Sequence, residues 1–443
     1  MANLITHSLT FEKESLTEFF LKPLFIGSDI RDMVTVRTDI QGTEKLDFIT
    51  KLRKITKAYA TGSSFTPSTG VTVTQKNLIV TLMKAQVNQS GSAFFGWVKE
   101  AALKKGFAWD NIDGTIFQQI VGELFAKAVA EDLQRQAFFG DLLKEKFVSG
   151  IPSHPDTATT LDLDYSEYDG FWTRVIRDMP SSNRVTVVNG AVAQEQTETL
   201  SSITAGTITL TVNGQTLSQA FATSADVTAA NWVTTHAAAL AARNQPIVVT
   251  DTGTGEITFV SGVPGLAMSI VETSAGTGGS WANVVTVANV LPADLATDEG
   301  VSILTSLWKL APNELIEFGV RGMRYMVTRS VMENYMETLE ELNGSDEAHR
   351  TMLNGTSVLT YRGVPIVVRP EWDTHIDADF GGVFPHRAIL TVPENFVLGT
   401  DLNGADNLVE MFYDQTEQEN IMRAQYKAGT QIIHELELLV AAF

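Results

Sequence analysis

Residues 420–428 read NIMRAQYKA, close to the end of a chain of 443 residues. Met422, Ala424 and Tyr426 alternate there with an arginine, a glutamine and a lysine. Because successive side chains of a strand point to opposite faces, this period of two predicts a half-buried antiparallel strand. We therefore expect the end of the chain to be folded and not to form a polar tail.

Further short strands are predicted on both sides of this stretch. They cover 361–368, 387–399, 409–414 and 430–442. In the last of them, His434, Leu436 and Leu438 are expected on one strand face, with the histidine in the core. His434 and the following glutamate begin like a zinc-binding HExxH motif, but Leu438 stands where the second histidine is required.

Length and composition limit the possible classes of protein. Single hydrophobic cores stop growing at about 250–300 residues, so this chain should contain two or three cores. It has no cysteine, which excludes disulfides, thiolate zinc sites and cysteine nucleophiles. The sequence shows neither a signal peptide nor an apolar run long enough to span a membrane, which predicts a cytoplasmic protein.

The chain is acidic, with 32 basic and 52 acidic residues and a formal net charge of −20. Binding of nucleic acid through counterion release requires a basic patch, so no sequence-specific DNA binding is expected. A strong net charge also keeps a protein made in many copies soluble.

An interval of unusual composition lies in the middle of the chain. No lysine occurs between Lys146 and Lys309, and residues 185–290 are mostly Thr, Ala, Val, Gly and Ser. Strands within it are predicted at 207–212, 215–221, 246–250, 256–260, 266–271 and 281–287. Asn213 and Gly214 form the strongest short hairpin signal. The interval is therefore predicted to be a separate small α+β domain, rich in strands.

A helix is predicted inside this domain, after the first hairpin. Asp226 or Thr228 can cap its N-terminus. Trp232, Ala239 and Leu240 are expected on its buried face.

Outside the inserted domain, helices are predicted at four places. The longest runs from Asp113 to Phe139, ends at Gly140 and is long enough to serve as a spine across a domain. Its apolar stripe includes Phe117, Ile120, Val121, Leu124, Ala128, Leu133 and Phe138. The other three helices are expected to start at Ser166, Thr297 and Thr328.

Two extended runs between residues 59 and 89 flank a Gly/Ser/Thr-rich tip at 62–70. A two-stranded ribbon with an arm as long as 71–87 is not stable alone, so it should lie on another element, most simply a neighbouring subunit. The candidate assembly residues of this extended loop are Phe65, Pro67, Val71, Val73, Leu78 and Val80.

Catalytic motifs are mostly absent, because the sequence has no GxSxG nucleophile elbow and no phosphate-binding loop. His375, Asp377 and Asp379 lie close together in a stretch that we expect to be extended, with His386 downstream. Such side chains suit a divalent cation, and a polar surface loop accounts for them equally. We therefore predict no catalytic residue and no cofactor, and keep these three residues as weak metal candidates.

The order of the elements resembles that of major capsid proteins of tailed double-stranded-DNA bacteriophages, the Hong Kong 97-like fold. In that family a Gly-x-Pro strand, here at 363–365, precedes an AILT strand with a downstream Asn and Gly, here at 388–399, and then long closing strands. The resemblance implies an α+β fold with an N-terminal arm, an extended loop, a peripheral domain with a spine helix, and an axial domain. The implied boundaries are 1–50 for the arm, 51–90 for the loop, 91–150 and 395–443 for the peripheral domain, 151–184 and 295–394 for the axial domain, and 185–294 for the insertion.

The resemblance also implies a function and partners. Subunits would assemble through pentamers and hexamers into an icosahedral shell that encloses the DNA genome in the virion, after assembly in the host bacterial cytoplasm. Portal, scaffold and accessory capsid proteins are the implied partners, and no membrane is involved. Besides the loop, the expected assembly residues are Phe117, Ile120, Val121 and Leu124 of the spine helix and Met422, Tyr426, Leu436 and Leu438 of the closing strands.

The sequence also gives expectations for three features that vary within the family: crosslinks, a scaffold segment and an insertion. Some members form covalent Lys-Asn links between subunits, but the loop tip at 63–70 has no lysine and Lys76 lies off it, so no such link is expected. The chain starts directly with the arm, which implies a separate scaffold or none. The insertion is expected to brace neighbouring capsomers, the alternative being an outward decoration that binds an accessory protein or a host glycan.

Two other functions compete with the capsid interpretation. A secreted or surface adhesin, or a surface-layer protein, would use the Thr-rich insertion to bind a glycan or a partner, but it predicts an export signal and repeated modules that the sequence does not show. A hydrolase using His375 and Asp377 would require a nucleophile, which the motifs do not provide.

Overall fold

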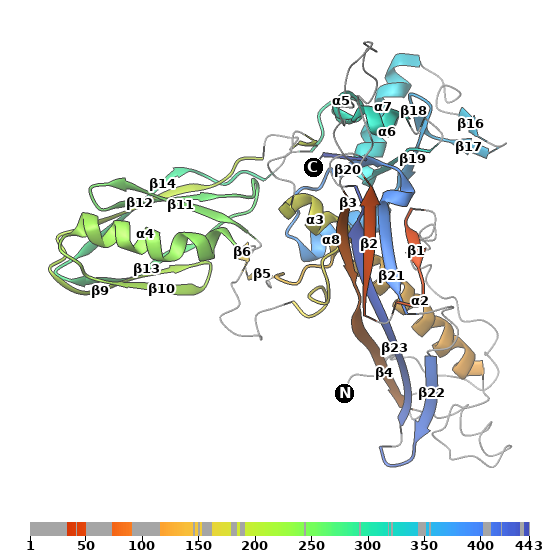
Figure 1. The fold of residues 1–443 in the computed structure, drawn as a ribbon, viewed down its shortest axis with the longest axis horizontal. Helices are drawn as coiled ribbons and strands as arrows, with labels where there is room; N and C mark the ends of the chain where they lie inside the picture. Colours follow the sequence, from red (N-terminus) through yellow and green to blue (C-terminus); the bar gives the residue numbers. More distant parts are fainter. Residues whose placement is uncertain are drawn as a thin grey trace, which may run out of the picture. The chain divides into compact units, whose positions relative to one another are not determined.

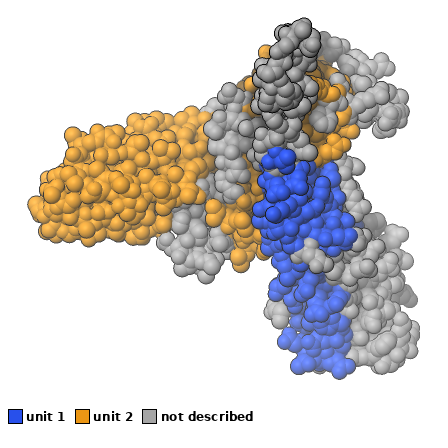
Figure 2. Space-filling view, in the orientation of Figure 1, with its two compact units in different colours: residues 1–26, 30–137, 396–433 blue, residues 27–29, 138–395, 434–443 orange. Residues whose placement is uncertain are grey.

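The structure, a computed structural model, describes the greater part of the chain in separate segments. These are residues 33–40, 42–49, 73–90, 116–144, 147–148, 151–152, 162–178, 184–186, 191–242, 245–291, 294–317, 319, 322–343, 351–353, 356–401, 409–417, 419–434 and 438–442. They form two compact units, coloured separately in Figure 2. Unit 1 takes its residues from 30–137 and 396–433, and unit 2 from 138–395 and 434–443. Helices and strands both occur, which confirms the α+β class.

The sheet of unit 1 is organised around its longest strand, β23 (Glu419–Ile432), which comes from the end of the chain (Figure 1). It pairs antiparallel with β4 (Thr81–Ser90), β21 (Phe396–Thr400) and β22 (Val409–Asp414). β1 (Thr35–Arg37) extends the sheet by pairing parallel with β21. Strands from both ends of the chain therefore build one sheet.

The alternation read from the sequence is confirmed in β23. Met422, Ala424 and Tyr426 are buried, whereas Arg423 and Gln425 are exposed. One face of the strand thus belongs to the core of unit 1, as the period of two predicts.

The extended run at 71–87 is interrupted, contrary to the expectation of one long arm. β3 (Val73–Ile79) pairs with β2 (Thr43–Ile49) as a two-stranded ribbon, and β4 pairs with β23 of the same chain. Between them, the Val80 N–H donates to the Gly42 carbonyl. The run was expected to lie on another element, most simply a neighbouring subunit; for β4 this element is β23 of the same chain and not a neighbouring subunit.

The spine helix is α2 (Ile116–Phe139), and it ends immediately before Gly140 as predicted. Phe125, Phe138 and Phe139 are buried, but Ala128 is exposed, so the expected stripe is wrong at that position. The side chains of Phe117, Ile120 and Val121 lie outside the described part of the structure.

Unit 2 contains a six-stranded sheet in the order β18-β19-β15-β20-β24-β7. Its strands are β7 (Val185–Thr186), β15 (Arg324–Val327), β18 (Thr360–Tyr361), β19 (Val364–Val368), β20 (Ala388–Thr391) and β24 (Leu439–Ala442). The core of this part joins buried residues of the sheet, such as Tyr325, Leu390 and Val440, to Leu304 and Val331. The last two residues come from helices α5 (Glu299–Leu310) and α7 (Arg329–Asn343).

The predicted strand at 430–442 suggested that the end of the chain continues the sheet of unit 1. The structure shows that it does not. β23 ends at Ile432, His434 lies in a bend, and β24 pairs with β20 in unit 2. Asn395 holds this turn, because its Nδ2 donates to the carbonyls of His434 and Leu438 and its Oδ1 accepts from the His434 N–H at 2.7 Å. The placement of His434 on a strand face is therefore wrong.

The remaining helix starts differ by a few residues from the predictions. α3 (Phe171–Asp178) starts five residues after Ser166, because turns occupy 163–167. α5 starts after Asp298, and α7 starts directly after Thr328 as predicted. The other short elements are β5 (Phe147–Val148), β6 (Ile151–Pro152), α6 (Asn313–Glu317), β16 (Thr351–Leu353), β17 (Thr356–Val358), α8 (Pro370–Asp379) and η4 (Pro393–Asn395).

The Thr-rich interval forms two sheets and a helix with a core of their own (Figure 1). The sheets have the orders β10-β9-β13 and β11-β12-β8-β14, and α4 (Ala225–Ala241) packs against strands of both. The strands are β8 (Glu195–Ser201), β9 (Ala205–Val212), β10 (Gln215–Ala220), β11 (Ile247–Gly253), β12 (Glu256–Ser261), β13 (Ile270–Thr277) and β14 (Ser280–Val287).

Several local predictions in this interval are confirmed and others are wrong. Asn213 and Gly214 have φ of 48° and 86°, the positive values that a tight hairpin turn requires. The helix cap is Ser224, whose hydroxyl accepts from the Val227 N–H, and neither predicted residue caps it. Trp232 and Leu240 are buried, but Ala239 is exposed. The sequence interpretation also missed β8 and placed the start of β13 four residues early.

Candidate assembly surface and the His375 cluster

The β2–β3 ribbon and the start of β4 expose large apolar side chains. Val73 is 60 % exposed, Ile79 59 % and Leu82 63 %. Isolated apolar residues on a surface are ordinary, but these three lie on one short segment beside a continuous sheet. We call these three residues the apolar ribbon surface. It is the candidate contact surface for another subunit.

Other residues of the predicted loop set have a different place. Leu78 and Val80 are buried and form a small core with Ile40, Leu46 and Val397. They stabilise the subunit itself and are not accessible to a partner. Phe65, Pro67 and Val71 lie outside the described residues, as does the loop tip.

The ribbon is fixed to the end of β23 by polar contacts and by close backbone packing. Lys76 Nζ donates to the Ile432 carbonyl at 3.0 Å, and Gln431 Nε2 donates to the Asn77 carbonyl at 2.9 Å. A Cβ atom at Gly429 would lie 1.9 Å from the Ile79 carbonyl oxygen. The missing side chain of Gly429 therefore allows the junction of β3 and β4 to approach β23.

Three of the four predicted closing-strand residues are core residues. Met422 is 1 % and Tyr426 7 % exposed in unit 1, and Leu438 is buried in the core of unit 2. Leu124 of α2 is half-buried, and Leu436 lies outside the described residues. Met422, Tyr426 and Leu438 therefore stabilise the subunit itself.

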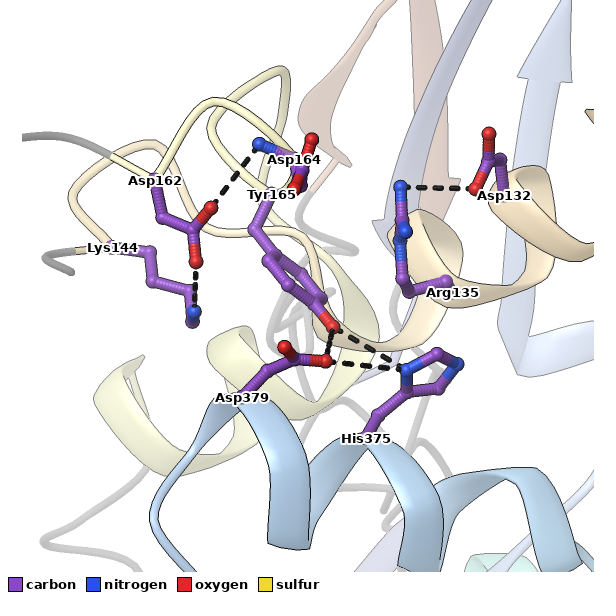
Figure 3. Close-up of polar contacts among 8 residues, drawn as sticks. All are labelled: Asp132, Arg135, Lys144, Asp162, Asp164, Tyr165, His375 and Asp379. Atoms are coloured by element: carbon purple, nitrogen blue, oxygen red, sulfur yellow. Dashed lines mark hydrogen bonds and ion pairs between the residues drawn. The ribbon is translucent and has the colours of Figure 1, made fainter. Parts of the chain in front are cut away.

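The candidate metal residues lie on a helix, so the expectation of an extended stretch is wrong. His375, Asp377 and Asp379 all belong to α8 (Figure 3 shows the first and last of them). Residues four apart on a helix share a face, whereas residues two apart do not. His375 and Asp379 therefore face the same neighbour, and Asp377 points elsewhere. Within the described segments, no group of three His, Cys, Asp or Glu residues could hold a metal ion.

The neighbour of this helix face is Tyr165. Its hydroxyl donates to Asp379 Oδ2 and lies 3.4 Å from His375 Nδ1, while the His375 and Asp379 side chains are 3.5 Å apart (Figure 3). Tyr165 is only 2 % exposed, so these polar atoms hold a buried ring in place. The cluster attaches the turn at 163–167 to α8, and its geometry is that of a structural contact.

A buried lysine continues this cluster on the other side of the Tyr165 ring. Lys144 Nζ forms an ion pair with Asp162 and lies 4.3 Å from the centre of the Tyr165 ring and 4.6 Å from that of Phe380. The charge is thus compensated by a carboxylate and by aromatic faces. Figure 3 also shows the Asp132–Arg135 ion pair of α2, at 3.0 Å.

His386 is separate from the His375 cluster. Its Nδ1 lies 2.9 Å from the Ser330 hydroxyl at the start of α7, and the residue is 6 % exposed. It therefore does not complete a metal site with the α8 residues.

The sequence interpretation missed a buried arginine directly before the AILT strand. The Arg387 guanidinium lies 5.2 Å from the ring centres of both Phe139 and Trp172, and donates to the Phe384 and Val383 carbonyls. Burial lowers its pKa to about 9. The only sign of this buried arginine in the sequence was a charged residue next to an apolar strand. Its aromatic partners could not be predicted, because they are distant in the sequence.

None of the described helices is both long and apolar enough to cross a membrane. No family model matches the sequence, and no curated protein matches it.

Several solved structures are similar to the chain over nearly its whole length. The capsid of Ralstonia phage GP4 shares 7 % identity, with 99 % of this chain and 97 % of that chain covered and a TM-score of 0.44. The capsid of Myoviridae phage XM1 shares 8 % identity, with 99 % and 100 % covered and a TM-score of 0.44. The capsid of cyanophage P-SCSP1u shares 10 % identity, with 98 % and 92 % covered and a TM-score of 0.41. All three are phage capsids.

Proposed function

We propose that the chain is a structural major capsid protein of a tailed double-stranded-DNA phage with a Hong Kong 97-like fold. Its copies assemble through pentamers and hexamers into the icosahedral shell of the virion, and it catalyses no reaction.

The order and pairing of the elements carry this proposal. The β2–β3 ribbon, most of the helix α2 and the long pair β4–β23 belong to one unit, although β23 lies more than three hundred residues after β4. Residues 138–395 and 434–443 belong to the second unit, which has its own six-stranded sheet. This is the arrangement that the resemblance implies for a peripheral domain with a spine helix and an axial domain.

In this proposal the boundaries expected from the sequence need two changes. The last strand, β24, belongs with the axial sheet and not with the peripheral closing strands, because it pairs with β20. The insertion is taken to begin near Val192 and end near Val290, whose backbones are hydrogen-bonded to each other. The arm and the loop tip keep their boundaries of 1–50 and 51–90.

The apolar ribbon surface is proposed to contact the neighbouring subunit. Such a contact is heterologous, so it generates a closed particle only through the symmetry of the whole shell. Permanent interfaces commonly bury about 2,000 Å² or more, and three exposed apolar side chains supply anchors for part of that area. The acidic chain encloses DNA without binding its sequence, and portal, scaffold and accessory capsid proteins are proposed partners.

Electron microscopy of the purified full chain tests this function. We expect uniform shells or capsomers, and Ile79→Asp should abolish them while leaving the circular dichroism and the melting temperature unchanged, because Ile79 is exposed in the subunit. Val248→Asp is the matched control, since this β11 valine is 52 % exposed and lies outside the ribbon. Monomers of the unmodified protein at high concentration would contradict the capsid function, whereas unchanged shells of Ile79→Asp would contradict only the role of the ribbon.

A further inference from the structure

The inner face of β8 is polar although it lies in the core of the inserted domain. Gln194 and the β8 residues Gln196 and Glu198 follow one another at every second position and are 8 %, 4 % and 0 % exposed. Burial of polar groups is unfavourable unless each finds a hydrogen-bond partner. The partners of these three side chains are therefore informative.

The two glutamines have their partners within the domain. Gln194 bonds both backbone groups of Met268, accepting from its N–H and donating to its carbonyl, each at 3.0 Å. Gln194 also donates to the Gln196 side-chain carbonyl at 3.2 Å. Gln196 in turn donates to Glu198 Oε1 at 2.7 Å.

The Glu198 carboxyl group is satisfied on one oxygen only. Oε1 accepts from Gln196 Nε2 and, at 2.8 Å, from Asn283 Nδ2 of the adjacent strand β14. Oε2 is buried and has no hydrogen-bond partner. An ionised carboxylate with one bare oxygen in a core is strongly unfavourable.

The other carboxyl group that interacts with Glu198 is that of Glu272 on β13. In the sheet register Glu272 lies opposite Leu210, which is fully buried, so it is on the same face of the three-stranded sheet, although Glu272 itself is exposed on the edge strand β13. Glu198 and Glu272 thus belong to different sheets. Two facing carboxylates have no donor between them unless one of the two carries a proton.

Among the described residues of the domain, no lysine or arginine compensates these acids. The described residues 191–242 and 245–291 contain neither lysine nor arginine. Strands β9, β10 and β14 contain no titratable side chain. The other titratable groups on the packed elements are Glu195 on β8, Glu256 on β12, Asp251 on β11 and Asp226 and His236 on α4.

We propose that Glu198 is protonated in the folded domain and donates a hydrogen bond from Oε2 to the Glu272 carboxylate, which joins the two sheets. Loss of this proton leaves two facing carboxylates and weakens the contact between β8 and β13. The inserted domain therefore contains a pH-sensitive connection, with a tight state at mildly acidic pH and a loose state at alkaline pH.

The electrostatics agree with this geometry. The pKa of Glu198 is raised from 4.5 to about 7, mainly by burial and additionally by Glu272. A carboxyl whose pKa is raised by folding stabilises the fold fully below its unfolded value, and this stabilisation is lost as the pH rises through the folded value. The connection is thus expected to weaken between about pH 6 and 8.

Hydrogen–deuterium exchange of the full chain tests the proposal. After correction for the intrinsic exchange rate, peptides that cover β8 and β13 should be protected on the order of tenfold more at pH 5.5 than at pH 8. Glu198→Gln should remove this difference, because its amide donates to Glu272 at every pH. Glu256→Gln, on the outer face of the same sheet, should retain it.

Two results would overturn the proposal. One is an equal pH dependence in the unmodified protein and in Glu198→Gln. The other is protection at pH 8 that calcium restores and a chelator removes, which would mean that a cation and not a proton joins the carboxyls. If Glu198→Gln does not fold, Glu272→Gln serves instead: its amide donates to ionised Glu198, so the pH difference should again disappear, and its persistence would contradict the proposal.

Discussion

At some positions, the close approach of two backbone segments limits which residue the chain can have. Gly429 is the clearest case, since a Cβ atom there would lie 1.9 Å from the carbonyl oxygen of Ile79. At Gly399 on β21 the space is instead filled by side-chain methyl groups of Ile40 and Leu78, each 2.9 Å from the position of a Cβ atom. Alternation in the sequence identified the buried side chains around these glycines. It did not identify the glycines, because their requirement comes from a strand that is distant in the sequence.

Replacement of Gly429 by alanine should destabilise unit 1 by about 3 kcal/mol, because the added methyl group overlaps backbone atoms that cannot move independently. Chemical denaturation of the isolated subunit, followed by circular dichroism, measures this change. Gly42→Ala is the matched control, since nothing lies within 4 Å of a Cβ atom there and its stability should stay nearly the same. Equal stabilities of the two variants would show that β3 and β4 do not approach β23 as described.

At the scale of helices and strands, some apolar side chains are buried in the subunit and others are exposed on it. Leu438 precedes β24 and packs in the core around the six-stranded sheet, whereas Leu82 on β4 is exposed. The sequence assigned both residues to apolar strand patterns. Their surroundings differ because one pattern is covered by the subunit's own helices and sheet, and the other stays exposed on the subunit.

Leu438→Asp should unfold unit 2, since it places a charge in an apolar core at a cost of about 4 kcal/mol or more. Loss of the cooperative melting transition and insoluble expression are the expected results. Leu82→Asp should change stability by less than about 0.5 kcal/mol and remain soluble, although it should impair shell formation. Soluble and folded capsomers of Leu438→Asp would show instead that this strand belongs to an interface.

At the scale of the whole molecule, the inserted domain begins and ends at two neighbouring residues. Val192 and Val290 bond each other through both backbone groups, at 3.1 and 3.3 Å. The two ends of the domain are therefore adjacent, and a short linker can replace everything between them. This geometry allows the bracing role of the domain to be separated from its folding.

Replacement of residues 193–289 by a short Gly-Ser linker should leave the rest of the subunit folded and reduce the fraction of closed shells, if the domain braces neighbouring capsomers. Electron microscopy gives the closed fraction, and a melting curve controls for folding. A linker variant that forms shells in unchanged yield and of unchanged thermal stability would favour an outward decoration instead.

Local features of this protein follow from its amino-acid sequence alone: the alternation in β23, the hairpin turn at Asn213, the end of α2 before Gly140 and the acidic charge. Each of these depends on neighbours along the chain, through strand period, backbone conformation or composition. Three other features are visible only in the folded chain: the run at 71–87 divides at Val80, β24 pairs with β20, and Glu198 is fully buried in the inserted domain. These features depend on which strand edges and apolar faces meet across hundreds of residues, and a local pattern contains no information about that choice.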